Sequence, residues 1–523
     1  MIHSYNKAHR YKLFIILFII PTFIKLNSQN VNITEKINYL VELNTNMSIG
    51  EVSPFWLSSN KYGLSSIEKN SGYLRGCIKQ NLIHNNKWRL TYGIDIALPV
   101  NYSSDFIIHQ LFSDIKYKRF LLEIGAKERL PELKNHLLST GAQTLGINAR
   151  PIPQIRLNIK DYLEIPYTKG FVHVKGHVAY GKMTDDRWQH SFTNRKSRFT
   201  DDVLFHSKAG VIKLGKNEGN VFAELGIEMA TQFGGTTYQP NEDGTISVTN
   251  NSKDLNAFLD AFIPNTSGDP YEQKYKFKNA EGNHLGSWIA RVTYNTKKWQ
   301  GSIYADHYFE DHSSMFFLDY DGYGTNEKWN KKVKNKYLLY DLKDIMMGIE
   351  LNLKTCNIIK DIVIEYIHSK YQSGPIYHDH NANTSDHIGG IDDYYNHYIY
   401  PGWQHWGQVI GNPLFLSPIY NKDHNINVKD NRFKAFHLGI NGNITNLISY
   451  RLLVTYREGL GIYNKPYTNY KYQTNLLSEI NYRFSGKKLK NWSIRSQFGL
   501  DFGKITGNNR GFNIIISKKG IIN

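Results

Sequence analysis

The sequence predicts an all-β fold, an antiparallel transmembrane β-barrel of about 18 strands with long extracellular loops. In the segment Trp88–Leu98, apolar and polar residues alternate without an error, so an extended strand there has one apolar and one polar face. Trp492–Gly503 shows the same alternation near the end of the chain. Strands of soluble sandwiches usually have about 5–6 residues, whereas these run to about ten, the length that crosses a bilayer at a tilt.

The first residues have the layout of a secretory signal peptide. Lys7, Arg10 and Lys12 precede the apolar run Leu13–Ile20, and we expect cleavage after Ser28. The apolar run is far shorter than the roughly 20 residues that a spanning helix needs. An exported chain without a spanning helix is secreted, periplasmic or an outer-membrane barrel, and the strand lengths favour the barrel. We therefore expect a signal peptide at 1–28 and one barrel domain at 29–523, located in the outer membrane.

Composition bounds the partners. The net charge is +17, and the four positive charges of the leader leave +13 on the mature chain. Because an exported chain does not meet nucleic acid, we expect acidic polysaccharides, outer-membrane lipids and lipopolysaccharide as neighbours. The alternative is a solvated basic surface without a specific partner. Cys77 and Cys356 form neither a disulfide framework nor a metal-ligand cluster, and we expect a monomer without a cofactor.

Further strands and their connections complete the predicted barrel. The additional strand candidates are Asn38–Met47, Tyr73–Leu82, Phe120–Lys127, Gln154–Glu164, Phe171–Tyr180, Val221–Thr231, Ser287–Asn295, Gln300–Tyr308, Asp361–Tyr371, Arg432–Gly442, Ser449–Arg457, Tyr472–Phe484 and a last strand within Gly511–Asn523. Tight turns at Asn295–Lys298 and Asn441–Asn443 suit the periplasmic rim. Long loops are expected at the other rim, over Asp185–Asp202, Phe233–Asn283, Glu310–Lys336 and Gln372–Asn431.

The alternation also assigns side chains to the two faces of the wall. Ile94 and Ile494 are expected to face lipid, and Thr91 and Gln497 to face a water-filled lumen. Charged residues of the late strands, such as Arg451, then lie in the lumen, where opposite charges pair across neighbouring strands.

One long loop contains a dense group of aromatic residues. Flat aromatic faces stack on sugar rings, and neighbouring amides and imidazoles bind hydroxyl groups. We therefore predict a carbohydrate-binding site that comprises Tyr394, Tyr395, Tyr398, Trp403, His405 and Trp406. Two alternatives stay open. The loop could fold into the barrel and bury these aromatics as a plug, or they could belong to the interfacial girdle.

No motif predicts catalysis. Gly176–Lys182 matches most of a phosphate-binding loop, but Met183 replaces the required Ser or Thr and the segment continues a strand. The serine-hydrolase motif Gly-x-Ser-x-Gly is absent from the sequence. Some loop residues are competent ligands for a divalent metal, but their spacing matches no helix-borne motif, so we expect exposed polar loops and no metal site: His307, Asp311, His312, His378, Asp379, His380, Asp386, His387, Asp392, Asp393 and His397. We expect a protein that is not an enzyme.

Several multi-residue motifs occur together in a familiar order. They are Ser53–Leu57 with Asn60–Gly63, Gly141–Gln154, Thr184–Trp188, and Gly407–Leu414 with Ser417–Tyr420. From about Tyr39 to the last strand, the chain resembles the Wzi family of capsule-assembly proteins in its Bacteroides-type form. The resemblance implies an outer-membrane lectin barrel of about 18 strands that binds capsular polysaccharide and helps to attach or assemble the capsule, without catalysis. One departure is the end of the chain, since such barrels usually end on an aromatic residue and this sequence ends on Asn523.

Two further functions compete with the lectin. In a porin or glycan-uptake channel, polar lumen residues such as Arg451, Arg495 and Asp501 would line a conduit. An outer-membrane hydrolase is disfavoured because the sequence offers no recognisable pair of nucleophile and base.

Overall fold

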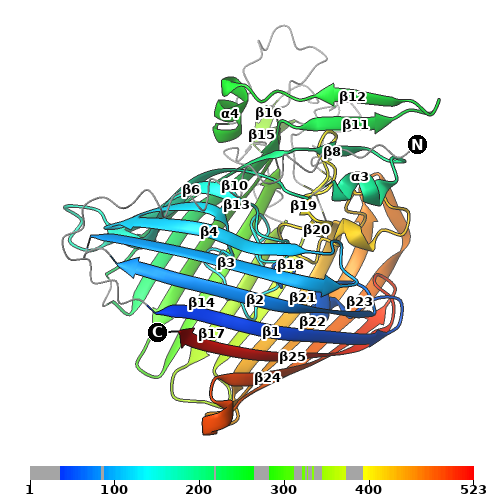
Figure 1. The fold of residues 1–523 in the computed structure, drawn as a ribbon. Helices are drawn as coiled ribbons and strands as arrows, with labels where there is room; N and C mark the ends of the chain where they lie inside the picture. The colour runs from blue at the N-terminus through cyan, green and yellow to red at the C-terminus, as the bar shows by residue number, and fades with distance from the viewer. Residues whose placement is uncertain are drawn as a thin grey trace, which may run out of the picture.

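Eighteen antiparallel strands close into one barrel, as the sequence predicts (Figure 1). The computed structural model describes residues 36–83, 87–185, 187–216, 219–263, 282–310, 321–323, 327, 332–334, 344–370, 372 and 393–522, so the expected leader lies outside the described residues. In Figure 1, β25 runs beside β1, and their pairing from Ile37 opposite Ile522 to Ile49 opposite Arg510 closes the barrel. The barrel strands are β1 (Ile37–Ile49), β2 (Asn70–Ile83), β3 (Trp88–Val100), β4 (Ile107–Tyr117), β5 (Phe120–Ala126), β6 (Gln154–Glu164), β7 (Val172–Lys182), β9 (Leu204–Leu214), β10 (Val221–Phe233), β13 (Asn283–Asn295), β14 (Trp299–Glu310), β17 (Ile345–Leu353), β18 (Asp361–His368), β21 (Arg432–Asn443), β22 (Ile448–Ile462), β23 (Lys465–Arg483), β24 (Trp492–Gly503) and β25 (Asn509–Ile522).

The two faces of the wall follow the predicted alternation. On β3, Tyr92 and Ile94 point outward and are exposed, whereas Thr91 and Asp95 point inward and are buried. Gln497 on β24 is likewise buried inside. The outward apolar belt suits lipid. The inward face differs from the expectation, because it is packed against protein in place of lining a water-filled lumen.

Every segment expected to be a strand coincides with a barrel strand within a few residues, but three strands, β4, β9 and β17, are missing from that expectation. On β9 the pattern is inverted near the rim, because Phe205 is buried on the lumen side while Lys208 points outward. The outward face is covered there by a helix, α4 (Leu255–Phe262), and the Lys208 ammonium donates to the carbonyl oxygen of Phe262. Because an outward side chain of β9 is polar and an inward one is apolar, the strand does not show the alternation expected of a lipid-facing strand, and the sequence did not predict it.

At one rim all connections between the barrel strands are short, whereas every long connection leaves the other rim. The turns that join β13 to β14 and β21 to β22 lie at the rim where the barrel begins and ends, at Ile37 and Ile522. All four long loops expected from the sequence leave the opposite rim, together with two that the sequence did not single out, residues 50–69 and 127–153. Outer-membrane barrels have short periplasmic turns and longer extracellular loops, so the long-loop rim is the extracellular one.

The long loops contain the remaining short elements, several of which stand above the barrel in Figure 1. None of the helices in the described ranges is both long and apolar enough to cross a membrane. The elements outside the wall are α2 (Phe55–Ser58), α3 (Trp188–Thr193), β8 (Phe199–Asp201), β11 (Thr236–Pro240), β12 (Ile246–Asn250), β15 (Asp321–Tyr323), β16 (Lys332–Lys334), β19 (Gln404–His405), β20 (Gln408–Val409), η5 (Pro418–Tyr420) and, in a turn of the other rim, η6 (Lys487–Leu489).

The main apolar core lies inside the barrel. It joins loop residues such as Trp56 and Leu138 with wall residues such as Tyr308 and Phe433. Three loop segments, residues 50–69, 127–153 and 393–431, contribute to this core and are called the plug below.

Candidate functional site

The aromatic loop in which the sequence predicts sugar contacts belongs to the plug. The indole Nε1 of Trp403 donates to the carbonyl oxygen of Thr144 at 3.0 Å, and the ring packs on Phe205 with 5.8 Å between centroids. Trp403 is therefore buried inside the barrel, where an extracellular polysaccharide does not reach it. The plug alternative predicts this arrangement. Four of the six predicted residues have 0% exposure: Tyr394, Tyr395, Trp403 and His405.

The motifs that resemble the capsule-assembly family also lie largely in the plug, where they bind one another. The N–H of Gly146 donates to the carbonyl oxygen of Ile410 at 2.9 Å, and the N–H of Tyr62 donates to that of Ile147 at 2.7 Å. A β-carbon at Gly411 would lie 2.0 Å from a tyrosine hydroxyl, so this position requires glycine. The main structural role of these motif residues is therefore to pack the plug.

Carboxylates on the barrel wall hold the plug in place. Glu365 of β18 accepts hydrogen bonds from the N–H of Thr140 at 2.8 Å and from the hydroxyl of Ser139 at 2.5 Å. On β14, Asp306 forms an ion pair with Lys134 at 2.5 Å. Hydrogen bonds to an ionised group are roughly twice as strong as neutral ones. These contacts fix the plug to one side of the wall, at the two strands that flank β17.

His405 links two loops as a neutral imidazole. Its Nε2 accepts the N–H of Thr184 at 3.1 Å, and its Nδ1 lies 3.0 Å from the carbonyl oxygen of Arg150, so the proton is on Nδ1. Burial lowers the pKa of His405 from 6.5 to about 4. The side chain is therefore uncharged at neutral pH and serves as a structural acceptor.

The other two predicted residues keep accessible surface. Tyr398 is 73% exposed, and the guanidinium of Arg198 lies 3.6 Å from the centre of its ring. Trp406 is half-buried, with the guanidinium of Arg150 at 4.2 Å from its ring. Each aromatic face thus has a cation beside it. The sequence reasoning missed Arg198 and Arg150 because they lie in other loops, more than 190 residues away along the chain.

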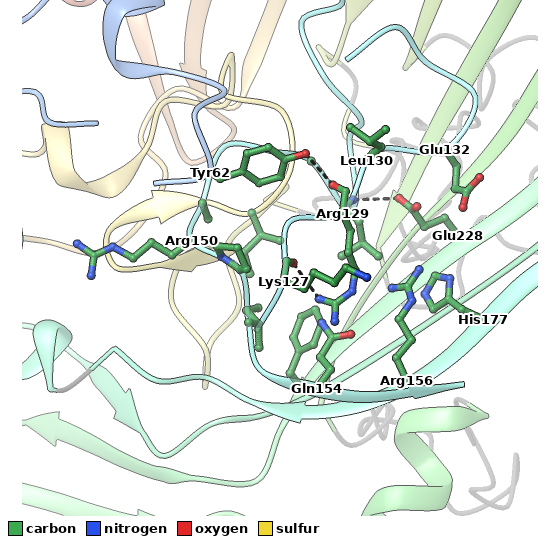
Figure 2. Close-up of a pocket in the computed structure, with 17 residues that line it drawn as sticks. Tyr62, Lys127, Arg129, Leu130, Glu132, Arg150, Gln154, Arg156, His177 and Glu228 are labelled. Atoms are coloured by element: carbon green, nitrogen blue, oxygen red, sulfur yellow. Dashed lines mark hydrogen bonds between the residues drawn. The ribbon is translucent and has the colours of Figure 1, made fainter. Parts of the chain in front are cut away.

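A pocket lies inside the barrel between the plug and the wall strands β6, β7, β9 and β10 (Figure 2). In Figure 2, Arg156 and His177 lie side by side and reach toward Arg129 from different elements. The charged residues of the lining are Lys127, Arg129, Arg150, Arg156, Glu132 and Glu228. Part of the lining, including Tyr62, Leu145 to Gln154 and Ile410, belongs to the motifs quoted above. Arg129, Arg156, His177 and Glu228 come from separate segments that no motif marks and that meet only in the fold.

One group of possible metal ligands comes together in the described part of the wall and plug. Single ligand atoms of Asp95, His109 and Glu128 lie within 4.8 Å of one another. A guanidinium nitrogen of Arg75 already binds this group, at 2.5 Å from Asp95 and 3.2 Å from Glu128. The arginine supplies the positive charge that these carboxylates need, so the cluster is an ion-pair network.

Most of the histidine and aspartate positions considered in the sequence lie outside the described residues: Asp311, His312, His378, Asp379, His380, Asp386, His387 and Asp392. Among those described, Nδ1 of His307 lies 2.9 Å from the carbonyl oxygen of Asp344. Nδ1 of His397 accepts the N–H of Ile399 at 3.1 Å. Asp393 accepts a hydrogen bond from Asn431 at 2.6 Å. These side chains are engaged in contacts within the plug and wall.

The fold and its packed interior define a class, the outer-membrane β-barrels. No protein-family model and no curated protein matches the sequence. Among solved structures, the chain is similar to Wzi of Escherichia coli, described as an outer-membrane protein involved in group 1 capsule assembly and a carbohydrate-binding β-barrel, with a TM-score of 0.53 and 10% identity over 98% of this chain and 89% of that chain. It is also similar to Pseudomonas aeruginosa OccK5, with a TM-score of 0.44 and 10% identity over 93% of this chain and 98% of that chain. At these identities the likeness extends to the fold, and the chain is an outer-membrane β-barrel protein.

Proposed function

We propose that this barrel is a lectin-like member of the Wzi family, without enzymatic activity, that binds capsular or other surface polysaccharide and helps to attach or assemble the capsule. It acts as a monomer among outer-membrane lipids and lipopolysaccharide. The motifs of the sequence support this proposal, as does the structural likeness to a barrel described as carbohydrate-binding. The observation that carries it is the plug.

The plug favours a binding protein over a porin. A conduit needs water beside its polar lining, but two of the three residues named for that lining, Arg451 and Asp501, have protein partners. Arg451 pairs with Glu479 at 2.8 Å, and Asp501 accepts the N–H of Phe55, a plug residue, at 3.0 Å. Because inward residues of the wall contact the plug, an extracellular polysaccharide would contact the outer face of the long loops.

Tyr398 and Trp406 are the two predicted residues that suit contact with a sugar. A pyranose ring has apolar C–H faces that stack on an aromatic ring. The neighbouring guanidinium groups of Arg198 and Arg150 suit the carboxylates of an acidic polysaccharide. The positive charge of the chain favours the same class of polymer.

The test is a glycan array with the purified full-length chain, folded in detergent. We expect binding to acidic polysaccharides, and we expect Tyr398→Ala and Trp406→Ala each to weaken it about 2- to 10-fold, the equivalent of one stacking contact. Tyr167→Ala is the matched control, since this tyrosine is fully exposed at the opposite rim. Absence of glycan binding together with the conductance of an open channel would establish the porin instead.

A further inference from the structure

Arg156 lines the pocket of Figure 2, and within the described part of the chain its guanidinium donates no hydrogen bond. Its residue is only 9% exposed and its Nε has no acceptor, and none of its N–H groups donates to a residue in the described ranges. The nearest carboxylate oxygen, on Glu123, lies 3.4 Å from Nε in an ion pair. A guanidinium has five N–H donors, and a buried donor without an acceptor is costly. A ligand in the pocket that carries hydrogen-bond acceptors would therefore satisfy the N–H groups of Arg156.

Two further side chains add donors at the same place. Arg129 makes long hydrogen bonds to backbone carbonyls, at 3.4 and 3.5 Å. Its Nε lies 3.6 Å from Glu123 in an ion pair and has no hydrogen-bond acceptor within the described ranges. His177 is buried, and neither of its ring nitrogens has a hydrogen-bond partner among the residues that the structure describes. Figure 2 shows these three side chains converging from the loop 127–153 and from β6 and β7.

The charges around them are not balanced. Lys127, Arg129 and Arg156 surround two carboxylates, with Lys127 at 2.9 Å from Glu123 and at 2.5 Å from Asp114. Both arginines share the same oxygen of Glu123, at 3.6 and 3.4 Å. Together with the other charged lining residues and their ion-pair partners, five cations (Lys127, Arg129, Arg150, Arg156 and Lys175) face four carboxylates (Glu123, Asp114, Glu132 and Glu228). One positive charge remains, and it attracts an anion that enters the pocket.

The rest of the lining suits hydroxyl groups and a ring. Glu228 uses one carboxylate oxygen to accept the N–H of Leu145 at 3.0 Å, and a carboxylate has further acceptor positions. Ile152 and Phe205 supply an apolar wall. The cavity volume is about 80 Å³ and the pocket is open at its mouth, so it has room for the carboxylate and part of the ring of one sugar unit and not for a polysaccharide chain.

We propose that this pocket binds an acidic monosaccharide unit, a uronate, with its carboxylate on Arg156 and Arg129 and its hydroxyls toward Glu228. Two guanidinium groups bind a carboxylate through paired N–H donors, a geometry that the ammonium of lysine does not provide. The pocket adjoins the face at Trp406 through Arg150, which lines the pocket and lies 4.2 Å from the centre of the Trp406 ring. The proposed carboxylate ligands, Arg156 and Arg129, are not part of that face, so the proposal stands whether or not the face binds a polymer.

The experiment is isothermal titration of the detergent-folded full-length chain with sodium glucuronate and, separately, with glucose, acetate and inorganic phosphate. We expect glucuronate to bind at least 10-fold more tightly than each of the others, because glucose lacks the carboxylate and the two small anions lack the ring. Equal binding of acetate or phosphate would reduce the pocket to a general anion site and overturn the proposal, as would glucuronate binding no better than glucose.

The variants locate the ligand. Arg156→Gln and Arg129→Gln should each weaken glucuronate binding at least 10-fold, and Arg156→Lys should retain part of it because it keeps the charge but not the paired donors. Arg451→Gln is the matched control, an identical change at a lumen arginine that already pairs with Glu479. If Arg156→Gln does not fold, Arg129→Gln and Arg156→Lys still show whether the two arginines bind glucuronate. Unchanged affinity in those variants would remove the arginines from the site, and failure of the glycan array would leave this result unaffected.

Discussion

Replacing Trp403 by alanine tests the plug directly. The indole is fully buried, packs on Phe205, and donates to the carbonyl oxygen of Thr144 at 3.0 Å. Truncation of a buried tryptophan costs about 3–5 kcal/mol through lost burial and the remaining cavity. Trp403→Phe removes the N–H and keeps most of the ring, so it should cost about 1–3 kcal/mol, the penalty for one unsatisfied buried acceptor.

Two assays on the same purified variants measure the effect. The temperature at which the folded gel species disappears should fall in the order wild type, Trp403→Phe, Trp403→Ala, and the alanine variant should open a conductance that the wild type lacks. Tyr167→Ala, a change at a fully exposed site, should match the wild type in both assays. The packing argument would be refuted if Trp403→Ala kept the wild-type unfolding temperature and showed no conductance but lost glycan binding. Trp403 would then belong to a sugar-binding site.

Two other predictions concern the wall and the pH response. Ile94→Arg places a cation on the outward face near the middle of β3 and should reduce folding by about 2–4 kcal/mol, as measured by the folded fraction on unheated gels. Thr91→Ser, an inward change that keeps the hydroxyl donated to Asn81, should cost less. Because the pKa of His405 falls from 6.5 in the unfolded chain to about 4 in the folded one, its stabilising contribution is present above pH 6.5 and is lost as pH falls toward 4. The full effect is about 3 kcal/mol and about 2 kcal/mol of it is lost by pH 5, so the unfolding temperature should drop over this range in the wild type and much less in His405→Gln.

The sequence predicts the wall well because the wall obeys a local rule. Lipid on one side and a polar interior on the other impose alternation on each strand, as at Thr91 and Ile94, without reference to distant residues. The alternation fails where another part of the protein, in place of lipid or water, contacts a face of the strand. On β9, helix α4 covers the outward Lys208 and the plug covers the inward Phe205, so both faces lose the expected polarity.

The candidate site was less predictable because a plug and a sugar platform require the same residue types. A loop that fills a barrel must supply apolar bulk and also polar groups for wall residues such as Glu365 and Asp306. Aromatic rings with interleaved amides and imidazoles meet both needs, and they also suit sugar binding. Tyr398 and Trp403 are five positions apart and alike in type, yet one is exposed and the other buried, because Trp403 meets Thr144 of another loop. The motifs that resemble the capsule-assembly family lie largely in this same packed unit, so their direct role in the structure is packing of the plug. The proposed sugar contacts therefore lie at the accessible residues Tyr398 and Trp406 and in the arginine pocket.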